Sequence, residues 1–287
     1  MIISLGLGLI AALCWGVHDI CVRYVSQRTG IIAAISTVLI FGALPLTPVC
    51  IYFGNWADLT MPAIGNSVLS GGLFALAAIA LYQAFAIGPV RLVAPIVGSY
   101  PILSVALAIW SGEPVAALHI FAVVLIIIGI TIVAQGDSNT GAGTRRIAIL
   151  WAASGAVGFF GSFASGQAAA ALGAELPVIW VARMAAIASI LFIALPFRIS
   201  LKPNRSQLQM LAAMGVLDAI ALAVVIYAGT QNFSAFASVT ASIFGLVTVI
   251  LAWVFLKEKM TGLQWIGVLV VFLSIGFLSL KTDNYET

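Results

Sequence analysis

The sequence predicts an all-α integral membrane protein whose ten transmembrane helices form a five-plus-five inverted repeat. The composition, a series of long apolar segments and an internal repeat lead to this prediction. Of the 287 residues, 63% are hydrophobic and only 7% are charged, and the mean hydropathy is +1.19. Soluble domains carry about a quarter charged residues, so this chain cannot cover itself with a water-facing surface. Because the net charge is only +3, with basic residues scattered over short loops, we expect no nucleic-acid partner.

Ten segments approach the roughly 20 mostly apolar residues that a membrane-spanning helix needs. Their expected bounds are 2–25, 31–53, 64–87, 92–111, 115–135, 146–171, 177–198, 207–231, 234–256 and 261–281. The loops between them are too short to hold a soluble domain. Proline removes a helical hydrogen bond and can kink a helix. Prolines inside these segments, away from their first residue, are Pro45, Pro48, Pro95, Pro101 and Pro196.

The two halves of the chain repeat at a spacing of 145 residues. This shift places Tyr82 on Tyr227 and Glu113 on Glu258. Each glutamate follows a long apolar helix, and we expect it to cap the helix that comes next, because a helix N-terminus favours negative charge. An odd number of spans in each half inverts the second half in the bilayer. The predicted domains are residues 1–136 and 145–282, joined by a polar stretch at 136–146.

Several short motifs carry a family resemblance. They are "WG" at Trp15–Gly16, "LYQAFAIGPVRLVAPIVGSYPIL" at Leu81–Leu103, "GEP" at Gly112–Pro114 and "FLKEKMTGLQWIGVLVVF" at Phe255–Phe272. In this order the chain resembles the EamA-type ten-helix members of the drug/metabolite transporter superfamily along essentially its whole length. The resemblance implies a central cavity and transport of small metabolites, often export. Many members carry an arginine in both spans two and seven, whereas this chain has only Arg183 in span seven.

Two indications of membrane orientation disagree. Turns after the odd-numbered spans contain nine basic residues, whereas the opposite side has only Lys281. Those nine are Arg28, Arg91, Arg145, Arg146, Arg198, Lys202, Arg205, Lys257 and Lys259. The positive-inside rule therefore places both termini outside the cytoplasm. The resemblance implies cytoplasmic termini, so both orientations stay open.

Two charged residues of the second half lie inside predicted spans and away from the span ends. Asp218 lies near the middle of its span, where a carboxylate costs about 2.5–3.5 kcal/mol on insertion scales. It could bind a cationic group, carry a coupling proton, or only hydrogen-bond between helices. Arg183 could bind a substrate carboxylate or phosphate with its planar guanidinium. Alternatively, Arg183 could extend to the membrane surface beside Trp180.

Span one carries a second polar group. Asp19 and Arg23 are four residues apart, so they could neutralise each other on one helix face, with Arg23 reaching toward the interface. Alternatively, Asp19 faces the cavity and His18 helps to move a proton. Neighbouring residues on a helix point about 100° apart, so we expect His18 and Asp19 not to face the same site.

Aromatic and amide side chains complete the predicted substrate site. Trp15, one turn before Asp19, could form an aromatic wall for an amine, and Tyr100 also lies deep in its span. Tyr82 and Gln83 lie in the part of span three that resembles the cavity-lining stretch of the family. Ordinary packing, or hydrogen bonding between helices, explains each of these residues as well.

Small residues recur every fourth position in span six. They are Ser154, Gly158, Ser162, Gly166 and Ala170. Such a ridge allows two helices to approach closely. It predicts either static packing or a surface on which the two halves slide.

The function predicted from the sequence is secondary transport of small polar metabolites, with amino acids or amines favoured and export the expected direction. Sugars or phosphorylated metabolites are the alternative substrates, and proton coupling is open. The sequence lacks the P-loop pattern of ATP-driven transporters, and we expect no enzyme activity because common hydrolase patterns are also absent. A channel or a membrane scaffold fits less well. We expect no cofactor or metal, a small-molecule substrate, a cell (inner) membrane location, and a monomer or homodimer in the lipid bilayer.

Overall fold

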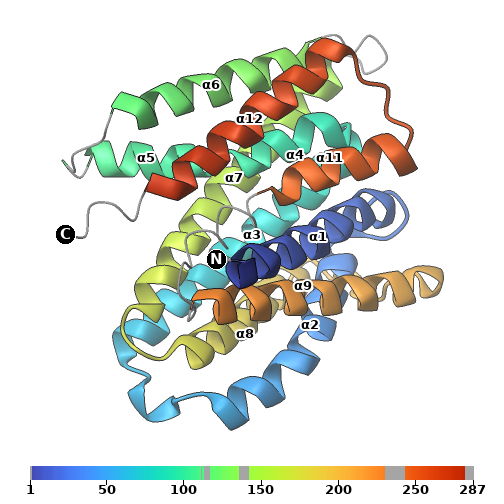
Figure 1. The fold of residues 1–287 in the computed structure, drawn as a ribbon. Helices are drawn as coiled ribbons and strands as arrows, with labels where there is room; N and C mark the ends of the chain where they lie inside the picture. Colours follow the sequence, from blue (N-terminus) through green and yellow to red (C-terminus); the bar gives the residue numbers. More distant parts are fainter. Residues whose placement is uncertain (1, 111, 113–116, 136–141, 230–242, 282–287) are drawn as a thin grey trace. The chain divides into compact units, whose positions relative to one another are not determined.

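The computed structural model describes residues 2–110, 112, 117–135, 142–229 and 243–281, and within these ranges its regular elements are helices (Figure 1). The longer helices are α1 (Ile2–Val25), α2 (Ile31–Phe53), α3 (Met61–Ile87), α6 (Ala117–Ala134), α7 (Ala142–Ala170), α8 (Glu175–Ala194), α9 (Leu208–Gly229) and α12 (Gly262–Lys281). The shorter ones are α4 (Val90–Gly98), α5 (Pro101–Trp110) and α11 (Phe244–Phe255). Two single 3₁₀ turns occupy Trp56–Asp58 and Arg205–Gln207.

Helix length and composition confirm an all-α membrane protein. In the described part of the chain, seven helices are long and apolar enough to cross a membrane, and two shorter apolar helices cover Phe244–Phe255 and Gly262–Phe277. Helix ends lie close to the predicted ones because a backbone inside lipid must satisfy its own hydrogen bonds, which ties helix length to the apolar run. The first part of predicted span nine and the turn containing Glu113 lie outside the described residues.

Predicted span four consists of two helices, α4 and α5, rather than one. Pro101 has no amide hydrogen, so it cannot donate the helical bond to the carbonyl of Val97. The Val97 carbonyl instead accepts from the amide of Tyr100 at 3.4 Å, and the Ser99 amide donates to Ile96 at 3.2 Å. These tighter contacts end α4 and allow Pro101 to begin α5. Pro45 and Pro48 lie inside α2, whereas Pro196 lies beyond the end of α8.

The chain divides into two compact units, and each unit draws on both halves of the sequence. The first unit contains residues 1–20, 87–153 and 220–287, and the second contains 21–86 and 154–219. The boundaries fall inside α1, α7 and α9, so these helices contribute to both units. The compact units are thus a different division of the chain from the predicted repeats.

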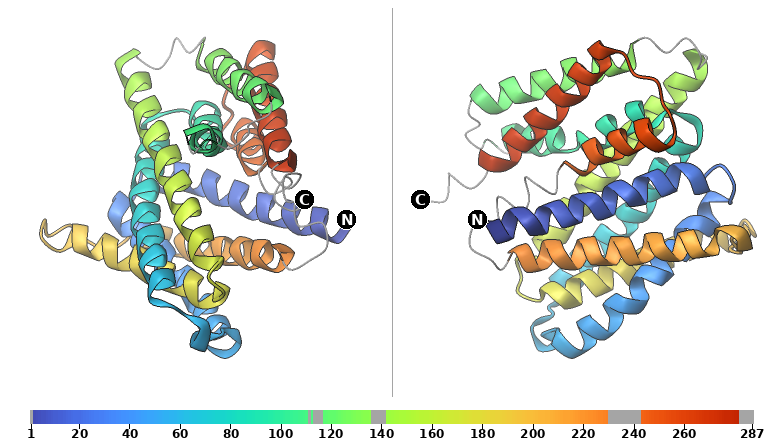
Figure 2. Two further views of the ribbon diagram at one scale, coloured as in Figure 1. Left: turned by 90° about the vertical axis from the view of Figure 1, so that its left-hand side faces the viewer. Right: turned by 45° about the vertical axis from the view of Figure 1, so that its right-hand side comes forward.

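In the first unit, α12 runs alongside α6 in each view (Figures 1 and 2). Their backbones cross closely at two glycines, because a Cβ added to Gly129 would lie 2.7 Å from the carbonyl oxygen of Gly267. α12 begins with a capping box, in which Thr261 and Gln264 exchange side-chain to backbone hydrogen bonds of 3.2 and 3.0 Å. The Gln264 amide group also donates to the carbonyl of Gln135 at 2.8 Å, beyond the last residue of α6.

In the second unit, the small-residue ridge of α7 packs against α3. A Cβ added to Gly158 would lie 2.8 Å from the Cβ of Ala77. The Ser70 hydroxyl donates to the carbonyl of Ser162 at 2.8 Å. The ridge is therefore a close contact between a helix of the first half of the sequence and one of the second half, which both interpretations of the ridge predict.

Glu258 caps a different helix from the predicted one. Its two carboxylate oxygens accept hydrogen bonds from the backbone amides of Val90 at 2.8 Å and Arg91 at 3.0 Å, at the start of α4. The Arg91 guanidinium lies 4.0 Å away and adds a favourable charge. The prediction that Glu258 caps the following helix is wrong, because Thr261 takes that position at the start of α12.

Candidate functional site

The structure joins two of the predicted site residues in a buried ion pair. Arg183 of α8 donates from Nη2 to Oδ2 of Asp218 of α9 at 2.5 Å. The side chains are only 7% and 14% exposed. Charge-assisted hydrogen bonds of this length are strong, and the low-dielectric surroundings make either charge costly on its own.

The guanidinium of Arg183 keeps one donor nitrogen unused. Nη1 is buried and has no hydrogen-bond partner among the described residues. It lies toward α2, since a Cβ built on Gly42 would come within 3.7 Å of it. Its Cζ lies 5.9 Å from the centre of the Phe74 ring of α3, at the outer range of a cation–π contact. The ion pair is therefore surrounded by α2, α3, α8 and α9.

Glycines allow these four helices to close around the ion pair. A Cβ on Gly71 of α3 would lie 2.1 Å from the carbonyl oxygen of Ala182, the residue before Arg183. A Cβ on Gly215 of α9 would lie 2.6 Å from the carbonyl oxygen of Val38 and 2.8 Å from the amide nitrogen of Gly42. These contacts leave no space for a side chain, so the glycines set the helix spacing beside Arg183 and Asp218.

Arg183 does not extend to the surface beside Trp180. The indole of Trp180 instead donates to the hydroxyl of Thr47 at 3.2 Å and meets Trp56 edge to face at 5.6 Å. The alternative in which Arg183 reaches toward the membrane surface is therefore wrong. Phe74 and Gly42, which lie near its guanidinium, are not among the predicted site residues. The glycines that recur in these spans are the one signal in the sequence that could have found Gly42.

In the first unit, His18 and Asp19 touch each other. Nδ1 of His18 lies 3.3 Å from Oδ1 of Asp19, and Asp19 is buried. We expected side chains about 100° apart to face different places, but the imidazole is long enough to reach the neighbouring carboxylate. The donor depends on the histidine tautomer.

Arg23 binds backbone carbonyls at the C-terminal end of α3. Its guanidinium donates to the carbonyl of Phe85 and, at 3.1 Å, to that of Ala86. The last carbonyls of a helix lack partners within it and carry partial negative charge, so a cation stabilises this end.

The remaining candidates lie in both units. In the first unit, Trp15 packs edge to face against Phe244 at 6.1 Å, and Tyr100 lies at the break between α4 and α5. In the second unit, Tyr82 and Gln83 are neighbours on α3, with Tyr82 buried and Gln83 partly exposed. Trp15, His18, Asp19 and Tyr100 thus belong to one unit, whereas Tyr82, Gln83, Arg183 and Asp218 belong to the other.

Among the described residues, no group of three or more histidine, cysteine, aspartate or glutamate side chains could hold a metal ion. The ion pairs that lie among the described helices include Arg183–Asp218, Arg91–Glu258 and the His18–Asp19 contact. Such ionisable groups are rare inside membrane helices and commonly mark substrate or ion pathways.

Comparisons with known proteins agree with this architecture. A solved structure titled "Crystal structure of protein" is similar to the chain, with a TM-score of 0.67 and 15% identity, covering 95% of this chain and 94% of that one. At 15% sequence identity, this similarity is evidence for the fold and not for the function. A search of curated proteins gives no match. The EamA-like transporter family matches residues 2–135 and 146–280. The chain is a multi-pass integral membrane protein and belongs to the EamA-like transporter family.

Proposed function

We propose that this protein is a secondary transporter that exports small zwitterionic metabolites, amino acids above all, by alternating access. The observation that carries the proposal is the buried Arg183–Asp218 pair with its spare Nη1 donor. Membership of a transporter family supports movement of a solute, and the ion pair supports the choice of solute.

The choice of a zwitterionic solute follows from the cost of breaking a buried ion pair. Removing one member of a buried ion pair costs about 3–5 kcal/mol, because the other charge stays uncompensated. An amino acid brings both charges: its carboxylate can bind Arg183 while its ammonium group binds Asp218. A sugar brings neither charge, a phosphorylated metabolite satisfies only Arg183, and a simple amine satisfies only Asp218. A zwitterion is therefore the ligand that opens the pair at the lowest cost.

Proton coupling is a second part of the proposal, and the His18–Asp19 contact favours it. Histidine changes its charge near neutral pH, and a carboxylate in contact with it can exchange the proton. In this scheme His18 and Asp19 of the first unit carry the proton, while Arg183 and Asp218 of the second unit bind the substrate.

Counterflow in proteoliposomes tests both parts. The purified protein would be supplied with amino acids, amines, sugars or phosphorylated metabolites, each with and without a pH gradient. We expect amino-acid counterflow that falls about tenfold or more in Arg183→Gln and in Asp218→Asn, since a hydrogen bond to a charged group contributes about 1.5–3 kcal/mol. His18→Gln should abolish the response to the gradient and leave counterflow. Glu175→Gln, an exposed carboxylate in the first turn of α8, is the control and should change neither readout.

Other outcomes would change the assignment. Counterflow of phosphorylated metabolites that depends on Arg183 but not on Asp218 would replace the zwitterion with an anion. Sugar counterflow unaffected by either substitution would remove the ion pair from the binding site. A gradient response that survives in His18→Gln would overturn the proposed proton path.

A further inference from the structure

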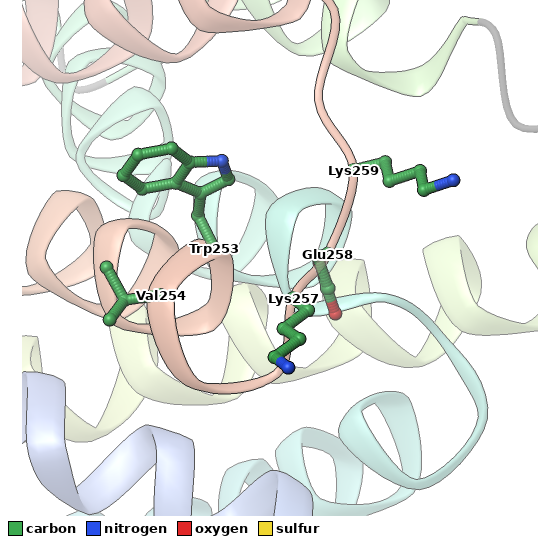
Figure 3. A pocket seen from close by; sticks show the side chains of 5 residues that line it. All are labelled: Trp253, Val254, Lys257, Glu258 and Lys259. Atoms are coloured by element: carbon green, nitrogen blue, oxygen red, sulfur yellow. The ribbon is translucent and has the colours of Figure 1, made fainter.

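A second polar site lies at the C-terminal end of α11. A pocket of about 420 Å³ opens there, and the residues that line it are Trp253, Val254, Lys257, Glu258 and Lys259 (Figure 3). Lys257 ends the helix by adopting a left-handed backbone conformation, with φ of 53°. The Glu258 amide then bonds back to the carbonyl of Ala252 at 3.4 Å, which closes the turn at the end of the helix. This turn fixes the directions in which the three charged side chains leave the backbone.

The charges of this pocket do not cancel locally. Glu258 turns inward and is held by the amides of Val90 and Arg91 and by the Arg91 guanidinium. Its carboxylate therefore already has hydrogen-bond partners at the start of α4. Lys257 and Lys259 are exposed, and the described residues give neither of them a carboxylate partner. Figure 3 shows the two lysines extending from the turn in different directions, on different sides of Glu258, and both residues line the pocket.

The remaining wall of the pocket is apolar and open. Trp253 is 51% exposed, and Val254 and the adjacent Phe255 are exposed as well. The Trp253 ring meets Trp265 edge to face at 5.8 Å, so two tryptophans lie together where α11 ends and α12 begins. Tryptophans gather at the level of the lipid headgroups, where one part of the ring is in hydrocarbon and another is in water. This end of α11 is therefore suited to the boundary between headgroups and acyl chains.

We propose that the pocket binds the headgroup of an anionic phospholipid. Lys257 and Lys259 bind its phosphate and any second anionic group, and Trp253, Val254 and Phe255 contact its glycerol and upper acyl chains. A soluble anion would gain nothing from the exposed apolar wall, and a neutral zwitterionic lipid would gain little from two unpaired lysines. Basic pockets at the ends of membrane helices are a known kind of site for acidic headgroups.

Native mass spectrometry of the full-length protein in detergent tests the proposal. The purified protein would be titrated with phosphatidylglycerol and, separately, with phosphatidylcholine of the same acyl chains. We expect tighter binding of the first phosphatidylglycerol, and roughly 30-fold weaker binding in Lys257→Gln/Lys259→Gln. Lys202→Gln/Arg205→Gln removes the same charge from exposed positions between α8 and α9 and is the matched control. Lys257→Arg/Lys259→Arg should keep the binding, and Trp253→Ala should weaken it.

Three results would overturn the assignment. Equal binding of the two lipids would show that the lysines do not select an anionic headgroup. Equal loss in the control double variant would show a non-specific effect of net charge. Displacement of phosphatidylglycerol by glycerol phosphate at equal concentration would make this a soluble phosphate site, because the acyl chains would then add nothing. Thermal unfolding of each variant in detergent identifies any loss that comes from misfolding. None of these readouts depends on the transported substrate.

Discussion

Inside the bilayer, a single charged side chain is expensive, and Arg183 and Asp218 share that cost by pairing across two helices. The pairing is incomplete, because the buried Nη1 of Arg183 keeps its hydrogen without an acceptor among the described residues. A buried donor without an acceptor costs about 1–3 kcal/mol. The site therefore retains the capacity to gain a ligand oxygen, and this is the property that a carboxylate substrate would use.

The ion pair makes a prediction about stability that is separate from transport. Arg183→Gln and Asp218→Asn should each lower the free energy of unfolding by about 3 kcal/mol, because each breaks a buried ion pair by removing one of its two charges. The double variant should lose less than the sum of the two, since neither charge remains. Thermal unfolding in detergent measures this coupling, with the exposed Arg198→Gln as the control. Strictly additive losses would show that the two side chains do not interact in solution.

At this scale the sequence identifies the charged residues but not their partners. An arginine and an aspartate inside apolar segments each demand compensation, which is why both could be predicted as site residues. Their pairing depends on how α8 and α9 pack, and 35 residues separate them in the chain. The same limit applies to Arg23. Its contacts with the carbonyls of Phe85 and Ala86 at the end of α3 join residues 62 and 63 positions apart in the chain.

At the scale of elements, glycine contacts decide how closely the helices approach. Gly71 and Gly72 are neighbours on α3 but have very different surroundings. A Cβ on Gly71 would lie 2.1 Å from the Ala182 carbonyl oxygen, whereas a Cβ on Gly72 would meet only the Ser189 hydroxyl, at 3.7 Å. The two positions share helix propensity, so a comparison of alanine variants isolates the packing effect.

We therefore expect Gly71→Ala to destabilise the protein by about 1–3 kcal/mol, since α3 and α8 must move apart. Gly72→Ala should be neutral or slightly stabilising, because alanine is the better helix former. Thermal unfolding in detergent measures both, and amino-acid counterflow shows whether the shift of α8 also reaches Arg183. Equal stability of the two variants would contradict the close contact between α3 and α8.

The extent of most of the described helices could be predicted, because hydropathy follows the apolar run that lipid imposes on the chain. The contacts at helix ends could not. Glu258 caps α4 rather than the helix that follows it, and Gln264 reaches across to the carbonyl of Gln135. Both contacts join residues more than a hundred positions apart, where the local sequence carries no information about partners. Pro101 did indicate a distortion, and the structure shows a complete break there.

At the scale of the whole molecule, the two sequence halves are interleaved. Each compact unit takes segments from both halves, so neither half contains a complete unit. The Glu258 cap is one such connection, because a carboxylate of the second half satisfies the first amides of a helix from the first half. The repeat describes how the sequence is organised, whereas the compact units describe how its helices pack.

This interleaving predicts the behaviour of a chain split within residues 136–141. Either half produced alone should fail to unfold cooperatively and should be degraded in the membrane, because its helices lack their packing partners. Co-produced halves should associate, copurify through a tag on one of them, and recover counterflow. Glu258→Gln in the second half should lower that recovery, since a helix cap contributes about 0.5–2 kcal/mol, while Glu175→Gln should leave it unchanged. A half that unfolds cooperatively on its own would show that the packing unit is the repeat after all, and that the contacts across the halves, including the Glu258 cap, add little to stability.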